Sequence, residues 1–220
     1  DAMCPCFLPL PSSPEGGKAT DTYLQLFISH NRGCQYYLGD YDRANDCFLP
    51  RAHGRMSWVD NGYFAPEALL MPDGRQIMWS WLPERREDEA KRFGWSGVYG
   101  VPRSLWLRED GTLGIAPIAE LRRLCGRMWS EASEVRSDRL LMEAEFAAGA
   151  PASMDVLVSP DGTEFVRISY DPARAALSVD VSQCGREGSR RIETAPLTLT
   201  EREPLKLTVF VDASIVEVFA

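Results

Sequence analysis

Residues 73–82 read DGRQIMWSWL, a turn dipeptide followed after Arg75 by a run of mostly apolar and aromatic residues. Asp-Gly between apolar segments is a strong hairpin signal. A short aromatic run bounded by turn residues is typical of a β-strand, so we expect a strand over 76–82. The same combination occurs at 104–108, where SLWLR precedes the turn Glu109-Asp110-Gly111. These two stretches favour antiparallel strands joined by tight turns.

Further strands are expected on both sides of this stretch, with no helix between them. Short alternating or aromatic segments recur at intervals of roughly 10–20 residues, a spacing that suits a propeller or a sandwich better than a βαβ fold. The last two strands flank a three-residue turn, Asp212-Ala213-Ser214. The sequence therefore predicts an all-β protein, with strands over 23–29, 35–39, 140–146, 154–158, 176–181, 205–211 and 215–219.

A domain boundary is expected near residue 118. Ala119–Leu124 follows Pro117 and reads as a short helical turn. We expect one domain over 1–117, a linker with a short helix over 118–130, and an antiparallel β-sandwich over 131–220. An apolar strand that runs up to Ala220 leads us to expect that this sandwich is truncated.

Charge and composition exclude several classes of protein. The formal net charge of −8 disfavours nucleic acid as a partner, because phosphate binding calls for clustered Lys and Arg. No apolar run approaches the roughly 18–20 residues of a membrane span, so no membrane partner is expected. The mixed-sign run 84–92 predicts a solvated helix or loop.

Cysteine spacing gives no support for a metal or cofactor. The six cysteines lack zinc-ribbon or thioredoxin spacing, and only two histidines are present to assist them. We therefore predict no metal site and no cofactor. Reduced thiols and an intracellular, cytoplasmic setting are favoured. His30 and His53 are expected to be structural or exposed, and neither a phosphate-binding loop nor a nucleophile elbow is found in the sequence.

Aromatic and acidic residues gather in the middle of the chain. Aromatic faces that stack on sugars, beside carboxylates that bind hydroxyl groups, are the usual components of a carbohydrate site. The alternative is that the aromatic rings only fill a β core, and the composition leaves both interpretations open. The residues concerned are Trp58, Asp60, Tyr63, Phe64, Glu67, Trp79, Trp81, Trp95 and Trp106.

Several segments, in order along the chain, resemble those of glycoside hydrolase family 32, the invertase and fructanase family. MCPCF at 3–7 is similar to its Cys-Pro-Asp-Phe element, and DNGYFAPE at 60–67 is similar to its aromatic-Ala-Pro-Gln element. DGRQIMWSW at 73–81 resembles a strand that ends in a pocket tryptophan. The remaining matches are GCQYYLG at 33–39, GWSG at 94–97 with VPRSL at 101–105, and VFVDASIVEVF at 209–219.

The resemblance implies the last blades of a five-bladed β-propeller over 1–117, followed by the β-sandwich. It also implies a retaining glycosidase that cleaves terminal β-fructofuranosyl units from a fructose-containing oligo- or polysaccharide such as sucrose or a fructan. Such chemistry uses a carboxylate nucleophile and a second carboxyl group about 5–5.5 Å away. The family's nucleophile segment, Trp-Met-Asn-Asp-Pro-Asn-Gly, does not occur here. We expect this chain to begin after it and to be inactive alone.

The position of the second carboxyl group departs from the family pattern. The resemblance places the acid/base glutamate directly before the Cys-Pro pair, where this chain has Met3, and an Asp or Asn where it has Cys6. Methionine cannot transfer a proton. Either the carboxylate is displaced, to Asp1 or further upstream, or the protein is a catalytically inactive carbohydrate-binding homologue.

The resemblance also implies a set of substrate-binding residues. Trp81 is expected to line the fructosyl pocket, Cys4 to lie against the sugar ring, and Tyr63 and Phe64 to form part of the wall. For Cys4 and Phe64, ordinary buried packing is the alternative. A third interpretation of the whole chain is a structural module in which the sandwich only stabilises the propeller.

Overall fold

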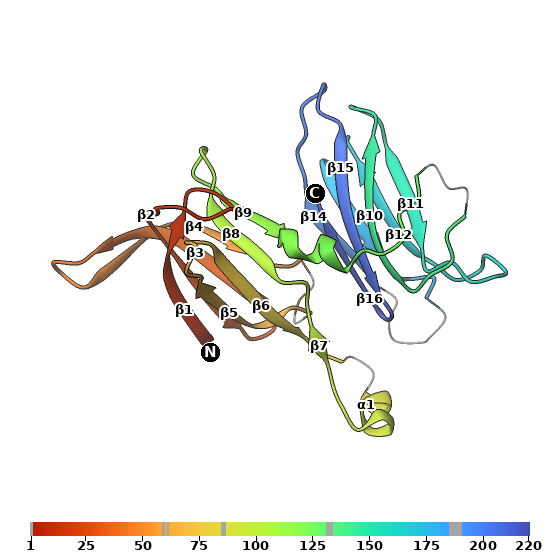
Figure 1. Ribbon diagram of the computed structural model, residues 1–220, viewed down its shortest axis with the longest axis horizontal. Helices are drawn as coiled ribbons and strands as arrows, with labels where there is room; N and C mark the ends of the chain where they lie inside the picture. Colours follow the sequence, from red (N-terminus) through yellow and green to blue (C-terminus); the bar gives the residue numbers. More distant parts are fainter. Residues whose placement is uncertain (1, 59, 61, 85–86, 131–133, 185–190) are drawn as a thin grey trace. The chain divides into compact units, whose positions relative to one another are not determined.

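The computed structural model describes residues 2–58, 60, 62–84, 87–130, 134–184 and 191–220 (Figure 1). The chain forms two compact units, Asp1–Met128 and Trp129–Ala220. All strand pairs in the described ranges are antiparallel, which confirms the all-β prediction. Within those ranges, the helices are too short or too polar to cross a lipid bilayer.

The first unit contains two sheets in which consecutive strands are neighbours. The first sheet has the order β1-β2-β3-β4, and the second has the order β5-β6-β8-β9 with the short β7 beside β6. The strands are β1 (Ala2–Pro11), β2 (Ala19–Ser29), β3 (Gly33–Asp42), β4 (Cys47–Arg55), β5 (Phe64–Leu70), β6 (Gln76–Leu82), β7 (Val98–Tyr99), β8 (Arg103–Leu107) and β9 (Leu113–Pro117).

One short helix interrupts the strands, contrary to the expectation that none would. Helix α1 (Glu87–Phe93) lies in the connection between β6 and β7, in the mixed-charge run for which a solvated helix or loop was expected. Its last turn carries Lys91 and Arg92, the charge that a helix C-terminus favours. The helical turn expected at Ala119–Leu124 is present as the 3-10 helix η1.

A shared core joins the two sheets of the first unit. Alternate residues of β2 point to one face, and Leu24, Leu26 and Ile28 are fully buried there. Met78 of β6 and Leu105 of β8 are equally buried and belong to the same cluster. Because side chains of a strand alternate between faces, this period of two predicts the face that each strand buries.

Among the strands of the first unit that were not expected from sequence are β1, β4 and β5, each of which contains proline. Pro5 lies in β1, Pro50 in β4 and Pro66 in β5. Proline cannot donate a ladder hydrogen bond, so it lowers the sequence signal for a strand and is tolerated at sheet edges. β1 and β4 are the two edges of the first sheet, and β5 is an edge of the second.

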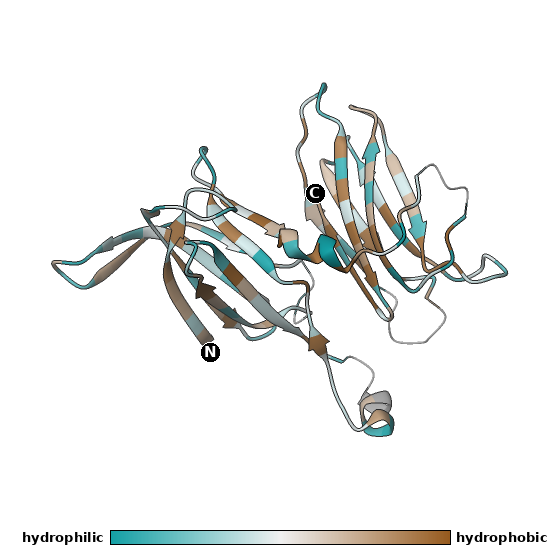
Figure 2. Ribbon diagram, viewed as in Figure 1, coloured by the Kyte–Doolittle hydropathy of each residue, from teal (hydrophilic) through white to brown (hydrophobic). Residues whose placement is uncertain are grey.

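The second unit also has two sheets around one core. Ile168 on one sheet and Val209 on the other are buried in the same cluster. Figure 2 shows hydrophobic and hydrophilic residues alternating along these strands. The orders are β10-β15-β16 and β11-β12-β13-β14, with β10 (Arg139–Phe146), β11 (Ala152–Val156), β12 (Val166–Asp171), β13 (Ala176–Asp180), β14 (Ile192–Pro196), β15 (Leu205–Asp212) and β16 (Ile215–Phe219).

The last hairpin is tighter than the sequence indicated. Asp212 pairs directly with Ile215, so the turn has two residues and not three. Ala213 takes a positive φ of 52°, and its N–H donates to the carbonyl of Asp138 at 2.7 Å. Two-residue hairpins require a left-handed residue, which sequence reasoning did not expect of an alanine.

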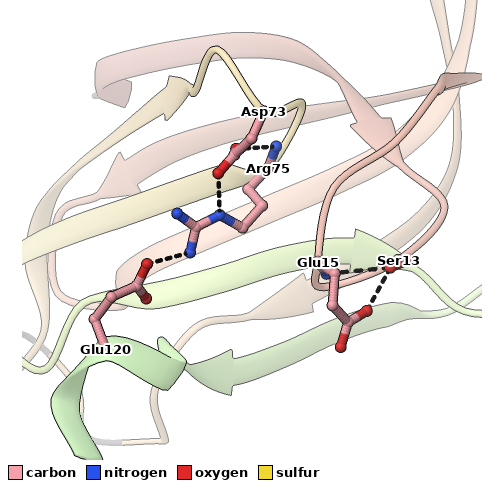
Figure 3. Close-up of polar contacts among 5 residues, drawn as sticks. All are labelled: Ser13, Glu15, Asp73, Arg75 and Glu120. Atoms are coloured by element: carbon pink, nitrogen blue, oxygen red, sulfur yellow. Dashed lines mark hydrogen bonds and ion pairs between the residues drawn. The ribbon is translucent and has the colours of Figure 1, made fainter. Parts of the chain in front are cut away.

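An arginine connects the β5–β6 hairpin with η1 (Figure 3). The Arg75 backbone N–H and Nε donate to the Asp73 carboxylate at 3.0 and 2.8 Å, and Nη1 donates to Glu120 at 2.7 Å. The pKa of Asp73 is lowered, first by the Arg75 backbone N–H and then by its guanidinium. Hydrogen bonds from the residue's own backbone N–H and from Arg75 lower the pKa of Glu120.

We expect Arg75→Ala to lower the unfolding temperature of the chain by about 2–4 °C at neutral pH. Both carboxylates have lowered pKa values in the folded state. The stability that they gain from pairing with Arg75 is therefore present above pH about 4, and it is lost as pH falls through the folded-state pKa values. The difference between wild type and variant should therefore shrink on acidification, as measured by thermal unfolding. Arg136→Ala, which removes a largely exposed ion pair with Glu134, is the control; an equal shift in both variants would contradict the role of Arg75.

Candidate active site

Two irregular strands mark one region of the first unit. In β1 the pairing with β2 shifts between Met3 and Cys6, and Cys4 has a φ of 50°. In β5 the pairing with β6 shifts between Phe64 and Glu67, and Ala65 has a φ of 45°. β1 and β5 contact each other. Left-handed backbone at residues other than glycine costs about 1–3 kcal/mol and gathers at functional sites, where bulges re-aim side chains.

The two bulged strands bring four side chains into contact. The Sδ atom of Met3 lies 3.0 Å from Nε2 of His30. The His30 and Phe64 rings meet edge to face at 6.0 Å, and Phe64 meets Trp81 in the same way at 6.1 Å. Met3 is 46% and Trp81 39% exposed. We call Met3, His30, Phe64 and Trp81 the Met3–Trp81 cluster, an accessible, largely apolar and aromatic surface.

Strand pairing and a glycine fix the indole of Trp81. Trp81 pairs with Phe64 on one side and with Tyr99 on the other. Gly97 has a φ of 73°, and a Cβ atom on it would lie 1.8 Å from the indole Nε1. A larger residue would therefore have to displace the ring, which explains a glycine at this point of the GWSG segment.

The turn that carries His30 is held by several hydrogen bonds. The Arg32 N–H donates to the Ser29 carbonyl at 2.9 Å, which closes the β2–β3 hairpin. The Arg32 carbonyl in turn accepts hydrogen bonds from the side chains of Gln35, at 2.9 Å, and Arg55, at 3.2 Å. His30 therefore projects from a tight turn anchored to β3 and β4.

Tyr63 lies in the core beside the cluster. Its exposed fraction is 1%, and the Arg103 guanidinium carbon lies 4.0 Å from the centre of its ring. Arg103 is itself buried and donates to the Met56 carbonyl at 2.7 Å. Tyr63 thus belongs to the core cluster against which Phe64 packs, and its part in a pocket wall stays a prediction.

The cysteines of β1 and β3 pack as apolar groups. Cys4 and Cys6 are half-buried against the core cluster, and Cys34 is inside it. Burial raises the pKa of Cys34 to about 12 and raises that of Cys6 as well. Since only a thiolate is a good nucleophile or metal ligand, these two thiols are unsuited to either role. The contact of Cys4 with a sugar ring stays a prediction.

The other aromatic residues singled out in the sequence have separate surroundings. Trp58 lies against Arg55, with the guanidinium carbon 5.5 Å from its ring. Trp95 stacks on Phe93 at 6.0 Å. Of the expected substrate-binding residues, Phe64 and Trp81 meet ring to ring, while Tyr63 is in the core cluster against which Cys4 and Phe64 pack. Asp1, the displaced-carboxylate candidate, lies outside the described residues. Among the described residues, no group of three or more His, Cys, Asp or Glu could hold a metal ion.

Sequence reasoning missed His30 as a site residue. It was expected to be structural or exposed, and it is exposed, but its neighbours are Met3 and Phe64. The available signal was its position in the turn between two expected strands. Only the pairing of β1 with β2 shows that this turn lies beside Met3.

Two family models match the sequence in tandem. "Glycosyl hydrolases family 32 N-terminal domain" matches residues 3–117, and "Glycosyl hydrolases family 32 C terminal" matches residues 125–220. The "Beta-fructofuranosidase, insoluble isoenzyme 2" of Daucus carota is 29% identical over 175 residues, which cover 71% of this chain and 29% of the relative. The "Levanase" of Bacillus subtilis is 28% identical over 220 residues, covering 87% and 32%. The chain thus spans about a third of these relatives' length.

Solved structures share the fold. The sucrose-6-phosphate hydrolase from Lactobacillus gasseri superposes with a TM-score of 0.80 at 18% identity, covering 99% of this chain and 47% of that one. The exo-inulinase from Aspergillus awamori gives a TM-score of 0.74 at 19% identity, covering 99% and 49%. At these identities the likeness establishes the fold alone.

Proposed function

Because this chain belongs to glycosyl hydrolase family 32, we propose that the complete protein hydrolyses terminal β-fructofuranosyl units of sucrose or fructans. The observation that carries the proposal is the match of both family domains, in order, to nearly the whole chain. The names of the relatives, a β-fructofuranosidase and a levanase, support the same substrate class. The partner is accordingly a fructose-containing oligo- or polysaccharide.

The same premise supports a finer description of the architecture. We propose that the two sheets of the first unit are the last blades of a five-bladed propeller, with the catalytic part over 1–117. The linker is assigned to 118–130, and the C-terminal domain over 131–220 is assigned as a β-sandwich. The shared cores between paired sheets support this assignment in each unit.

The Met3–Trp81 cluster is the proposed fructosyl-binding surface. Trp81 offers a partly exposed ring to the apolar face of a sugar, and Phe64 fixes that ring from its edge. Cys4, in the adjacent bulge, is assigned to contact with the sugar ring, and Tyr63 and Phe64 are assigned to part of the pocket wall. The bulges of β1 and β5 orient these residues from two neighbouring strands.

The complete protein is expected to release fructose from sucrose and inulin, whereas the 220-residue chain alone should release none. The physical reason is that fructosyl transfer needs a carboxylate nucleophile, and the family's nucleophile segment is not part of this sequence. Fructose release from both substrates, assayed for both proteins, checks this expectation. Turnover by the 220-residue chain would contradict it.

A catalytically inactive carbohydrate-binding homologue is the second candidate function. The observation in its favour is Met3, which stands at the family's acid/base position and has no proton to transfer. This candidate predicts that the complete protein binds sucrose or fructose in calorimetry without releasing products. Fructose release by the complete protein decides for the enzyme.

A further inference from the structure

His30 is the member of the Met3–Trp81 cluster whose side chain is a general acid or base in enzymes. We propose that His30 is the proton donor to the departing sugar oxygen, in place of the glutamate that the family pattern puts at residue 3. The inference rests on the proposed function, since it concerns cleavage of the same bond. It also explains how hydrolysis can proceed with Met3 at that position.

The imidazole lies beside the place where the missing carboxyl group would be. Methionine and glutamate side chains both reach their δ atom after the same number of bonds. A glutamate at residue 3, in the rotamer of Met3, would therefore place its carboxyl carbon at the position of Sδ. Nε2 of His30 lies 3.0 Å from that Sδ atom.

The contact with Met3 also assigns the hydrogen. A thioether sulfur is a weak acceptor and has no hydrogen to donate. For the contact to be a hydrogen bond, Nε2 of His30 must carry the hydrogen and donate it to Sδ. The N–H bond then points into the cluster, towards the surface assigned to the sugar.

Two features hold the imidazole in this orientation. The edge-to-face contact with Phe64, at an interplanar angle of 83°, connects it to the ring that contacts Trp81. The hydrogen bonds that Arg32 receives and donates hold the turn on which His30 stands. A proton donor held on a rigid turn beside the binding surface meets the geometric need of general acid catalysis.

His30 transfers one proton in each of the two steps of the reaction. A carboxylate nucleophile of the complete protein forms a bond to the anomeric carbon while the bond from that carbon to the leaving oxygen breaks. The imidazolium of His30 gives its Nε2 proton to that oxygen, so the leaving sugar departs as a neutral alcohol. Neutral His30 then takes a proton from water as the water oxygen attacks the fructosyl ester, which releases fructose and restores the carboxylate.

Leaving-group dependence tests the proposal in the complete protein. His30→Gln should lower kcat/KM for sucrose by about 10²–10⁴-fold, the usual contribution of general acid catalysis. The same variant should keep kcat/KM for a 4-nitrophenyl β-fructofuranoside within about tenfold of wild type, because 4-nitrophenolate leaves without a proton and kcat/KM reports the step in which the leaving group departs. Met3→Glu in the His30→Gln background should restore sucrose hydrolysis at least about tenfold, since it supplies a carboxyl acid.

His53→Gln is the matched control, since His53 lies on β4 against Tyr37, with the ring centres 4.9 Å apart. This variant should hydrolyse both substrates at the wild-type rate. Sucrose hydrolysis by His30→Gln at the wild-type rate overturns the proposal while the proposed function stands. An equal loss of kcat/KM on both substrates indicates a structural role and also overturns it. A wild-type protein inactive on both substrates overturns the proposed function and this inference together.

Discussion

Replacing Trp81 with alanine in the complete protein is expected to lower kcat/KM for sucrose by roughly 10–100-fold. The indole is 39% exposed, and it is the largest ring of the Met3–Trp81 cluster. Covering an aromatic side chain of this kind with an apolar sugar face contributes about 1.5–3 kcal/mol. A loss of that size corresponds to the stated range of rates. Initial rates over a range of sucrose concentrations give the measurement.

Trp129→Ala supplies the control for this substitution. Trp129 is 43% exposed, so the same large side chain is removed from a similar degree of exposure in the other unit. It should leave kcat/KM unchanged. The free energy of unfolding of Trp81→Ala should change by less than about 1 kcal/mol, because the ring is partly solvated. Unchanged kcat/KM together with reduced stability would instead assign Trp81 a structural role.

Replacing Ile168 with alanine is expected to destabilise the second unit by about 2–5 kcal/mol. Ile168 is 1% exposed on β12 and belongs to the core that also includes Val209 of β15. Removing three carbon atoms there costs their transfer free energy and leaves a cavity between the sheets. The measurement is urea unfolding of the 220-residue chain, followed by a signal from the second unit.

Ile192→Ala tests whether burial is the cause. Ile192 lies on β14 of the same unit and is 60% exposed, so the chemical change is identical but little contact is lost. Its effect should stay within about 0.5 kcal/mol. Similar destabilisation by both variants would show that the two sheets do not depend on this core.

Local patterns in the sequence were sufficient for short apolar strands beside turn residues. The expected strand 76–82 coincides with β6, and 215–219 coincides with β16, because each is a short, mostly apolar run that follows turn residues. The proline-containing strands β1, β4 and β5 escaped this reasoning. They form because neighbouring strands supply the other half of each ladder, which is a property of the sheet and not of the segment.

The candidate site, too, was predicted only in part from the sequence. Sequence motifs selected Phe64 and Trp81, which the structure brings into contact. They also selected Tyr63, whose ring is buried against Arg103, and its part in a pocket wall stays a prediction. The bulge at Ala65, a left-handed residue without a glycine signature, could not be read from the sequence.

What the sequence alone determined is the all-β class, the membership of the glycosyl hydrolase family and the absence of a proton donor at residue 3. These follow from residue identity and short-range periodicity, which are written along the chain. The tertiary structure alone decided that His30 lies beside Met3 and that the Tyr63 ring is buried in the core. Such neighbours depend on register and on backbone bulges, since a shift of one residue in a strand turns every side chain to the other face.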